Sequence, residues 1–327
     1  MKALVTGGSG FLGRKVCALL LERGLEVHSI SRRFHQDMDD QGIVQHTASI
    51  TDKHELAKAI KGMQVVFHTA ALAGIWGDKK NYEDINIHGT QNVIDLCKDE
   101  NIQYLIYTSS PSVVFDGEDQ EMVDESTPYP GSFLCDYSRT KAVAEKMVIE
   151  SNHNNLKTVS LRPHLIWGVG DNHLIPRLLD RAESGKLKVI GDGKNKVDMV
   201  HIDNAAAAHL DAYDALISGT GAGKAYFITN DEPVAMWDWL NDLLTKLDKK
   251  VIEKKVPSNI AYGISTIFEF LYKIFRITKD PPLTRFVVRQ FCTHHTYNIK
   301  NAQNDLNYKI RTTMEDGLKE LLDHLKK

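Results

Sequence analysis

The stretch that decides the fold is "KALVTGGSGFLG", residues 2–13. A short apolar run leads directly into spaced glycines, and an amphipathic helical pattern follows as far as Gly24. Such glycines allow a tight turn and let backbone N–H groups approach a pyrophosphate at the positive end of a helix. The motif alone is weak evidence, but its position between a strand and a helix predicts a dinucleotide site. The residues expected to line it are Gly7, Gly10, Phe11, Leu12 and Gly13.

Apolar runs alternate with helical patterns through the first half of the chain. The runs, apolar nearly throughout, are "KALVTG", "EVHSIS", "QVVFHTAA", "QYLIYTSS" and "KTVSLRP". Strands of this kind, separated by helices, form a parallel sheet that is covered on both faces. We therefore predict an α/β fold with a doubly wound parallel Rossmann sheet in residues 1–165, to which residues 195–230 return. Segments 166–194 and 231–327 are less periodic, and we predict that they form a smaller, mostly helical substrate-binding lobe.

Composition and charge exclude several classes of partner. The 327 residues carry a net charge of about −3, and no basic tract of the kind that follows a phosphate backbone occurs, so we expect no nucleic acid partner. Four widely separated cysteines are typical of reduced thiols, so we expect a cytoplasmic protein, and we expect no signal peptide before the first predicted strand. We predict no metal site, because adjacent residues such as His294 and His295 seldom point at one ion. His164 is expected only as a residue lining the pocket.

The end of the second predicted strand bears on the choice of cofactor. A dinucleotide-binding fold normally places an acid there, which binds the hydroxyls of the adenosine ribose. Here the position is occupied by Ser31, and Arg32 and Arg33 follow. A 2′-phosphate could accept a hydrogen bond from Ser31 and pair with a guanidinium, since no carboxylate repels it. The sequence therefore favours NADP(H), and NAD(H) stays open.

The reactive residues are predicted in "CDYSRTKAVAEKM", residues 135–147. A carbonyl that accepts a hydride develops negative charge on its oxygen and needs a proton donor, which Tyr137 can supply. Lys141 lies one helical turn further on, so both side chains share one face of a helix. At about 4 Å and an effective dielectric of about 20, an ammonium attracts a phenolate by some 4 kcal/mol. We therefore expect Lys141 to lower the pKa of Tyr137.

A hydroxyl partner for this tyrosine is predicted at the end of the strand in "YLIYTSSPSVV". The carboxyl ends of parallel strands form the edge at which ligands bind in this fold class. Ser110 is the first choice to orient the substrate oxygen, and Ser109 is the alternative. A YxxxK pattern occurs by chance in many helices, but the glycine loop, the serines and this pattern in chain order form a strong combined signal.

These motifs together resemble the extended short-chain dehydrogenase/reductases, from "TGGSGFLG" almost to the C-terminus. The resemblance implies a catalytic set of Ser110, Tyr137, Lys141 and Asn86, the last helping to order water and the lysine. It also implies cofactor contacts from Ala70 and Ala71 of "HTAA", from Pro163 beside the nicotinamide, and from Tyr137 and Lys141. Ser49-Ile50 replaces the acid–aliphatic pair that often holds adenine in this family, so only Ile50 is expected to contribute there.

Phrases in the second half, such as "LRPHLIWGVGDNHLIPRLL" and "NIKNAQNDLNYK", narrow the resemblance. They are similar to the branch that holds 3β-hydroxysteroid dehydrogenases, sterol-4α-carboxylate 3-dehydrogenases and 2-alkyl-3-ketoalkanoate reductases. This implies an NADP(H)-dependent oxidoreductase that interconverts a β-keto and a β-hydroxy group on a bulky lipophilic substrate, in a homodimer. One alternative is a nucleotide-sugar epimerase or dehydratase with tightly bound NAD. Another is a non-catalytic NADP-binding sensor, although this chain keeps the full catalytic set.

The segment 258–277, "SNIAYGISTIFEFLYKIFRI", has an amphipathic helical pattern of its own. One helical face carries mainly Ile, Leu and Phe, while Ser265, Glu269 and Lys273 lie opposite, with Glu269 and Lys273 spaced to pair. Two interpretations stay open. The apolar face packs on its own protein, which we favour, or it forms a lipid-facing lid or an interfacial helix. In the second case the protein makes peripheral contact with a membrane.

Overall fold

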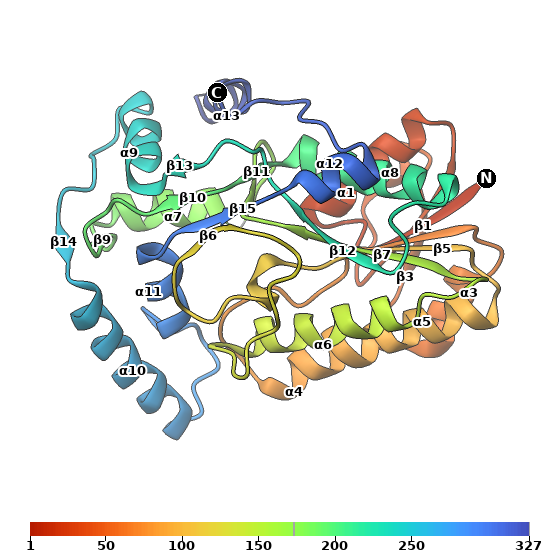
Figure 1. Cartoon of the computed structure of the whole chain (residues 1–327), viewed down its shortest axis with the longest axis horizontal. Helices are drawn as coiled ribbons and strands as arrows, with labels where there is room; N and C mark the ends of the chain where they lie inside the picture. Colours follow the sequence, from red (N-terminus) through yellow and green to blue (C-terminus); the bar gives the residue numbers. More distant parts are fainter. Residues whose placement is uncertain (173, 327) are drawn as a thin grey trace.

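In the computed structural model, which describes residues 1–172 and 174–326, a parallel sheet of seven strands forms the centre of the molecule (Figure 1). The strand order is β12-β7-β5-β4-β1-β2-β3, and every neighbouring pair is parallel. The strands are β1 (Lys2–Thr6), β2 (Glu26–Ser31), β3 (Val44–Thr47), β4 (Val65–His68), β5 (Tyr104–Thr108), β7 (Lys157–Pro163) and β12 (Lys224–Ile228). The predicted doubly wound sheet is confirmed.

Helices cover both faces of this sheet, because its strands are apolar on both sides (Figure 1). Neighbouring residues of β1 enter different cores: Val5 packs in one and Leu4 in the other. On the Val5 side lie α1 (Phe11–Glu22), α8 (Ile202–Ser218) and α12 (Lys300–Leu306). On the Leu4 side lie α3 (Lys53–Ile60), α5 (Gly89–Asp99) and α6 (Asp136–Glu150). The short α2 (Gln36–Asp39) precedes β3.

The strand order reverses direction between β1 and β4, which lie side by side at the centre of the sheet. From β1 the chain runs outward through β2 and β3, and from β4 it runs to the other edge through β5, β7 and β12. Loops after β1 and β4 therefore leave in opposite directions and open a crevice at the carboxyl ends of the strands. The predicted glycine loop follows β1 directly, so it lies at this crevice.

The remaining segments form a lobe beyond the carboxyl ends of the strands (Figure 1). Its helices are α7 (Leu174–Glu183), α9 (Met236–Lys246), α10 (Ser258–Ile274), α11 (Arg285–Cys292) and α13 (Met314–Leu325). A four-stranded sheet also runs through it, made of β13 (Val234–Ala235), β10 (Lys196–Val197), β15 (His295–Tyr297) and β6 (Gln120–Val123). Two-stranded pairs join β11 (Val200–His201) to β8 (Ile166–Trp167), and β14 (Lys255–Val256) to β9 (Val189–Ile190).

The lobe is mostly helical, as predicted, but its strands were not all foreseen. Most of them have two or three residues, too few for a sequence pattern to distinguish them from loops. In segment 195–230, α8 packs on the central sheet and β12 joins it, while β10 joins the sheet of the lobe. The boundaries between the two domains stay a prediction.

The expectation that the apolar face of α10 packs on its own protein is wrong. Its apolar face points to solvent, and the residues that it buries are Ala261, Ser265 and Glu269. Glu269 pairs with Arg285 of α11 rather than with Lys273. No helix in the described part of the chain is long and apolar enough to cross a membrane.

Candidate active site

A cavity of about 390 Å³ lies at the carboxyl edge of the central sheet, between the glycine loop and the lobe. Its walls come from the ends of β1, β4, β5 and β7, from α6 and from α11. The predicted site residues that line it are Gly7, Gly10, Phe11, Leu12, Gly13, Ala71, Ser110, Tyr137, Lys141 and Pro163. The tertiary structure therefore brings together most of a residue set that spans more than 150 positions of sequence.

The glycine loop has the geometry of a pyrophosphate cradle. Gly7 has φ of +71°, and a Cβ there would lie 2.8 Å from the Cα of Ala70. A Cβ on Gly13 would lie 2.3 Å from the carbonyl oxygen of Gly7, so the start of α1 packs closely under the loop. No side chain caps α1, and the N–H groups of its first turn face the crevice at the positive end of the helix dipole. These residues fit a bound dinucleotide.

The adenosine end of this cradle lies beside β2. The N–H of Gly7 donates to the carbonyl of Ile30 at 2.8 Å, which sets the glycine loop next to Ser31. Arg32 and Arg33 are exposed, and the hydroxyl of Ser31 donates to the carbonyl of Arg33 at 2.8 Å. No carboxylate stands at position 31 to repel a 2′-phosphate.

Two further predicted cofactor residues lie outside the cavity. The N–H of Ala70 donates to the hydroxyl of Thr6 at 3.2 Å, which holds the end of β4 against β1. Ile50 is buried, and its side chain is close to Gly89 of α5. Its contact with a bound adenine stays a prediction.

The phenol of Tyr137 lies in the wall of the cavity, in the first turns of α6. Burial raises the pKa of Tyr137 to about 12, and its hydrogen bond with Ser110 partly opposes that shift. Ser110 is therefore the serine that contacts the phenol, while Ser109 is buried and its N–H donates to the carbonyl of Leu161 at 2.6 Å. At neutral pH the tyrosine is a protonated hydrogen-bond donor.

Lys141 lies deeper in the same wall and is almost completely buried. Its Nζ donates to the carbonyl of Thr108 at 2.5 Å and lies 4.1 Å from the centre of the Tyr107 ring. Burial lowers the pKa of Lys141 to about 7, and the charge of Glu145 partly opposes that shift. The expected lowering of the pKa of Tyr137 by this ammonium is not found: burial raises that pKa, and the opposing effect comes from Ser110 rather than from Lys141.

Asn86 lies in a π-helical turn, η1 (Glu83–His88), between α4 (Lys79–Tyr82) and α5. Its amide accepts from the N–H of Leu72 at 2.7 Å and donates to the carbonyl of Leu72 at 3.2 Å and to the hydroxyl of Thr140 at 3.0 Å. Among the contacts of the described residues it has no hydrogen bond to Lys141. Asn86 therefore links the loop after β4 to α6, and its role in ordering water and the lysine stays a prediction.

A buried ion pair joins α6 to β7. Glu145, one turn after Lys141, accepts from Arg162 of β7 at 2.7 Å and from the hydroxyls of Tyr129 at 2.8 Å and Ser160 at 3.0 Å. Burial alone would raise the pKa of Glu145, but the charge and hydrogen bonds of Arg162 hold it below its usual value. Tyr137, Lys141 and Glu145 are spaced four residues apart, so they share one helical face. This spacing is visible in the sequence, but Glu145 was not predicted as part of the site.

The residues of the opposite wall of the cavity were also not predicted from the sequence. Phe286 and Gln290, one turn apart on α11, face the glycine loop from the lobe. Nothing in their local sequence distinguishes them from other helical residues, so no sequence pattern could have identified them. His164, expected as a lining residue, does line the cavity, and its Nδ1 lies 2.6 Å from the carbonyl oxygen of Asp198. Burial lowers the pKa of His164 to about 4, so the ring is neutral at pH 7.

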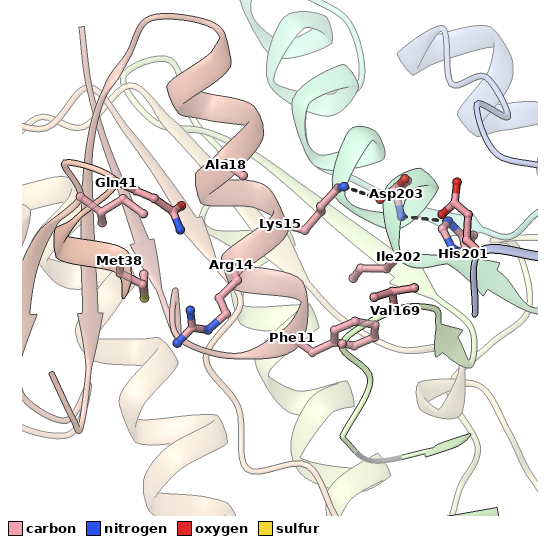
Figure 2. Close-up of a pocket in the computed structure, with 13 residues that line it drawn as sticks. Phe11, Arg14, Lys15, Ala18, Met38, Gln41, Val169, His201, Ile202 and Asp203 are labelled. Atoms are coloured by element: carbon pink, nitrogen blue, oxygen red, sulfur yellow. Dashed lines mark hydrogen bonds and ion pairs between the residues drawn. The ribbon is translucent and has the colours of Figure 1, made fainter. Parts of the chain in front are cut away.

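A second cavity, of about 400 Å³, lies along the outer face of α1 (Figure 2). Arg14 and Lys15 point into it, but each is already paired, Arg14 with Asp37 and Lys15 with Asp203. None of the predicted catalytic residues lines it. No group of three or more His, Cys, Asp or Glu side chains able to hold a metal ion occurs in the described part of the chain.

The family model of the 3-beta hydroxysteroid dehydrogenase/isomerase family matches residues 4–257, which is most of the chain and includes the glycine loop and α6. The chain belongs to this family. Its members are extended short-chain dehydrogenases/reductases, so the protein is an NAD(P)-dependent oxidoreductase.

Two relatives illustrate the range of this family. The chain is 42% identical to the 2-alkyl-3-oxoalkanoate reductase of Stenotrophomonas maltophilia over 98% of each protein. It is 33% identical to the mouse sterol-4-alpha-carboxylate 3-dehydrogenase, decarboxylating, over 100% of this chain and 92% of that protein. In fold it is similar to the Thermus thermophilus UDP-glucose 4-epimerase in complex with NAD, with a TM-score of 0.76, 20% identity and coverage of 100% and 99%.

Proposed function

We propose that this oxidoreductase uses NADPH to reduce the 3-keto group of a 2-alkyl-3-keto acid. The observation that carries the proposal is the division of the cavity: a proton-donating pair, Tyr137 and Ser110, faces apolar residues of the lobe. Those apolar residues are Ile166 and Phe286, and Leu165, at the boundary of the Rossmann domain, adds to them. The relative from Stenotrophomonas maltophilia, similar over its whole length, is named for this activity.

The proposed chemistry follows from the protonation states of the side chains in the cavity wall. When bound, NADPH supplies the hydride. Tyr137 donates its proton to the carbonyl oxygen as negative charge develops there, and Ser110 holds that oxygen in place by a hydrogen bond. Because the pKa of Tyr137 lies well above 7, the phenol is protonated at neutral pH and has the proton that reduction requires. Lys141, whose pKa of about 7 lets it hold or release a proton, lies beside this donor.

A nucleotide-sugar substrate is a poorer match for the same cavity. A diphosphate needs cationic partners, usually arginines. Among the described lining residues Lys141 is the one cation, and Asp171 adds a carboxylate to the wall. The sterol class stays the nearer alternative, since a sterol, like a long-chain 2-alkyl-3-keto acid, is bulky and apolar and carries no diphosphate.

NADPH is proposed over NADH because of the residues after β2. Ser31, Arg32 and Arg33 can receive a 2′-phosphate at the end of the strand where an acid would repel it. The double substitution Arg32→Ala/Arg33→Ala should raise KM for NADPH roughly tenfold or more and leave KM for NADH unchanged. The matched control is Lys61→Ala/Lys98→Ala, which removes two exposed cations elsewhere.

The decisive experiment follows the absorbance of NADPH and NADH with purified protein and three substrates. These are a long-chain 2-alkyl-3-keto acid, a 3-ketosteroid and a UDP-sugar. The proposal expects NADPH oxidation to be fastest with the keto acid and to be lost in Tyr137→Phe. Faster turnover of the steroid would move the substrate to the sterol class, while turnover of the sugar alone with retained NAD would overturn the proposal.

A further inference from the structure

Helix α10 exposes an apolar face that no other part of the described chain covers. Its residues at intervals of three or four, including Ile264, Ile267 and Ile274, are 40–60% exposed. Phe270 at its flank is 62% exposed, and Phe275 at its end is 69% exposed. Figure 1 shows α10 at the edge of the molecule with α11 on its inner side. Contiguous apolar surface of this kind marks an interaction site, whereas single exposed apolar residues need no explanation.

The orientation of α10 is fixed by polar contacts on its other side. The carboxylate of Glu269 accepts from the N–H of Arg285 at 2.7 Å and from its guanidinium at 2.8 Å. Ser265 and Ala261, on the same side, are buried against the protein. Rotating the helix to bury its isoleucines would break the ion pair and expose this interface. The apolar face therefore needs a partner from outside the fold.

The charges near this face are positive where the helix ends. Lys273, Arg276 and Lys279 are exposed there. The two acids of the same stretch are both paired: Glu269 with Arg285, and Asp280 with Arg177 at 2.7 Å. Unpaired charge at this end of α10 is thus cationic, which complements an anionic surface.

Aromatic residues stand beside these cations. The indole N–H of Trp76 donates to the carbonyl of Ile277 at 2.9 Å, and its ring lies edge-on to Tyr272. The Nζ of Lys273 lies 6.0 Å from the centre of the Trp76 ring. Tryptophan and tyrosine flanked by lysine and arginine are typical of the boundary between lipid headgroups and acyl chains.

We propose that α10 docks the protein on an anionic lipid surface, with its apolar face in the acyl boundary and its terminal cations among the headgroups. A helix of this kind lies in the plane of the interface and does not cross it. The proposal does not depend on which ketone the enzyme reduces.

Helix α10 lies next to elements that line the catalytic cavity. Helix α10 packs on α11, whose Phe286 and Gln290 line the cavity. The loop that carries Trp76 also carries Ala73, another lining residue. Both segments that touch α10 thus form part of the cavity wall, so a lipid surface bound to α10 would lie next to a site proposed for a lipophilic substrate.

The test is co-sedimentation of the full chain with two kinds of vesicle: phosphatidylcholine alone, and equal parts of phosphatidylcholine and phosphatidylglycerol. The wild type should bind the anionic vesicles, and added salt should weaken binding. The variant Ile267→Ser/Phe270→Ser/Ile274→Ser should lose at least tenfold in partition coefficient. The control Val143→Ser/Ile217→Ser/Leu325→Ser changes three exposed apolar residues that lie apart, and it should bind like the wild type.

A second variant isolates the charges. Lys273→Gln/Arg276→Gln/Lys279→Gln should weaken binding to anionic vesicles by about fivefold for each cation removed. Its control, Lys61→Gln/Lys98→Gln/Lys319→Gln, changes three exposed lysines elsewhere. NADPH oxidation with a water-soluble ketone should be unchanged in every variant, because none of these residues lines the cavity.

Three outcomes would overturn the proposal. The wild type sediments with neither vesicle, or the apolar variant binds as well as the wild type. In the third, gel filtration shows a wild-type dimer that becomes monomeric in the apolar variant while vesicles have no effect. That last result would assign the face to a second copy of this chain. Failure of any of these tests leaves the proposed reductase activity untouched, since that is measured separately.

Discussion

Helices α6 and α10 both bury charged side chains, but the surroundings of the two helices differ. On α6 the half-buried Tyr137 and the buried Lys141 line a cavity, and Glu145 forms an ion pair behind them. On α10 the buried acid, Glu269, joins the helix to α11, and the apolar residues are left outside. In both cases the inward polar group is held by an arginine from a neighbouring element, Arg162 or Arg285.

The difference shows that the orientation of an amphipathic helix is not set by its hydrophobicity alone. A charge is buried only when a partner compensates it, and that partner comes from elsewhere in the chain. On α6 the compensated charge, Glu145, lies behind the residues that line the cavity. On α10 it fixes a helix whose free face is then available to a partner.

The largest effect is expected on the activity of the enzyme, from a substitution on α6. Tyr137→Phe should lower kcat for ketone reduction about a thousandfold, because the proton donor is lost while the ring is kept. Tyr104→Phe is the matched control, since Tyr104 stands at the opposite end of β5 and should retain full activity. Steady-state NADPH oxidation measures both. Activity of Tyr137→Phe near that of the wild type would remove Tyr137 from the mechanism.

The two inward acids should differ in what they contribute to stability. Glu145→Gln leaves Arg162 buried without its counter-charge and should cost roughly 3 kcal/mol or more of unfolding free energy. Glu269→Gln should cost about 1 kcal/mol, because Arg285 is one-third exposed and can be solvated. Urea unfolding of both variants measures the contrast. Equal losses would mean that the two ion pairs play the same role.

The buried lysine of α6 should make stability depend on pH. The pKa of Lys141 is about 7 in the folded protein and near 10.5 when unfolded, so the unfolded chain binds more protons between these values. Stability from this group therefore rises with pH from 7 to 10.5, by at most about 1.4 kcal/mol per unit. Lys141→Met should lack this rise. Parallel curves of unfolding free energy against pH for the two proteins would contradict the assignment.

The smallest effect is expected on α10. Ile267→Ser should change the unfolding free energy by no more than about 0.5 kcal/mol, because the side chain is already in solvent. Val148→Ser on α6 replaces a fully buried apolar residue and should cost about 2 kcal/mol or more. Thermal and urea unfolding would show the contrast. A large loss in Ile267→Ser would indicate that α10 packs inward.

Much of the fold was predictable because its signals are local. The apolar strands, the glycine loop and the Tyr137–Lys141 spacing each lie within a dozen residues, and all appear where expected. The two-residue strands of the lobe carry no such signal, since they are defined by pairing partners far along the chain. Phe286 and Gln290 were missed for the same reason, as only the folding of the lobe over the sheet brings α11 to the glycine loop.

The sequence by itself determined the parallel sheet, the glycine loop after β1 and the placing of Tyr137 and Lys141 on one helical face, because periodicity and short spacings fix backbone geometry locally. Only the tertiary structure decided the protonation of Tyr137 and Lys141, since burial depends on what surrounds a side chain. It also decided which way α10 faces. The pattern of that helix specifies two faces, but the position of Arg285 selects the one that is buried.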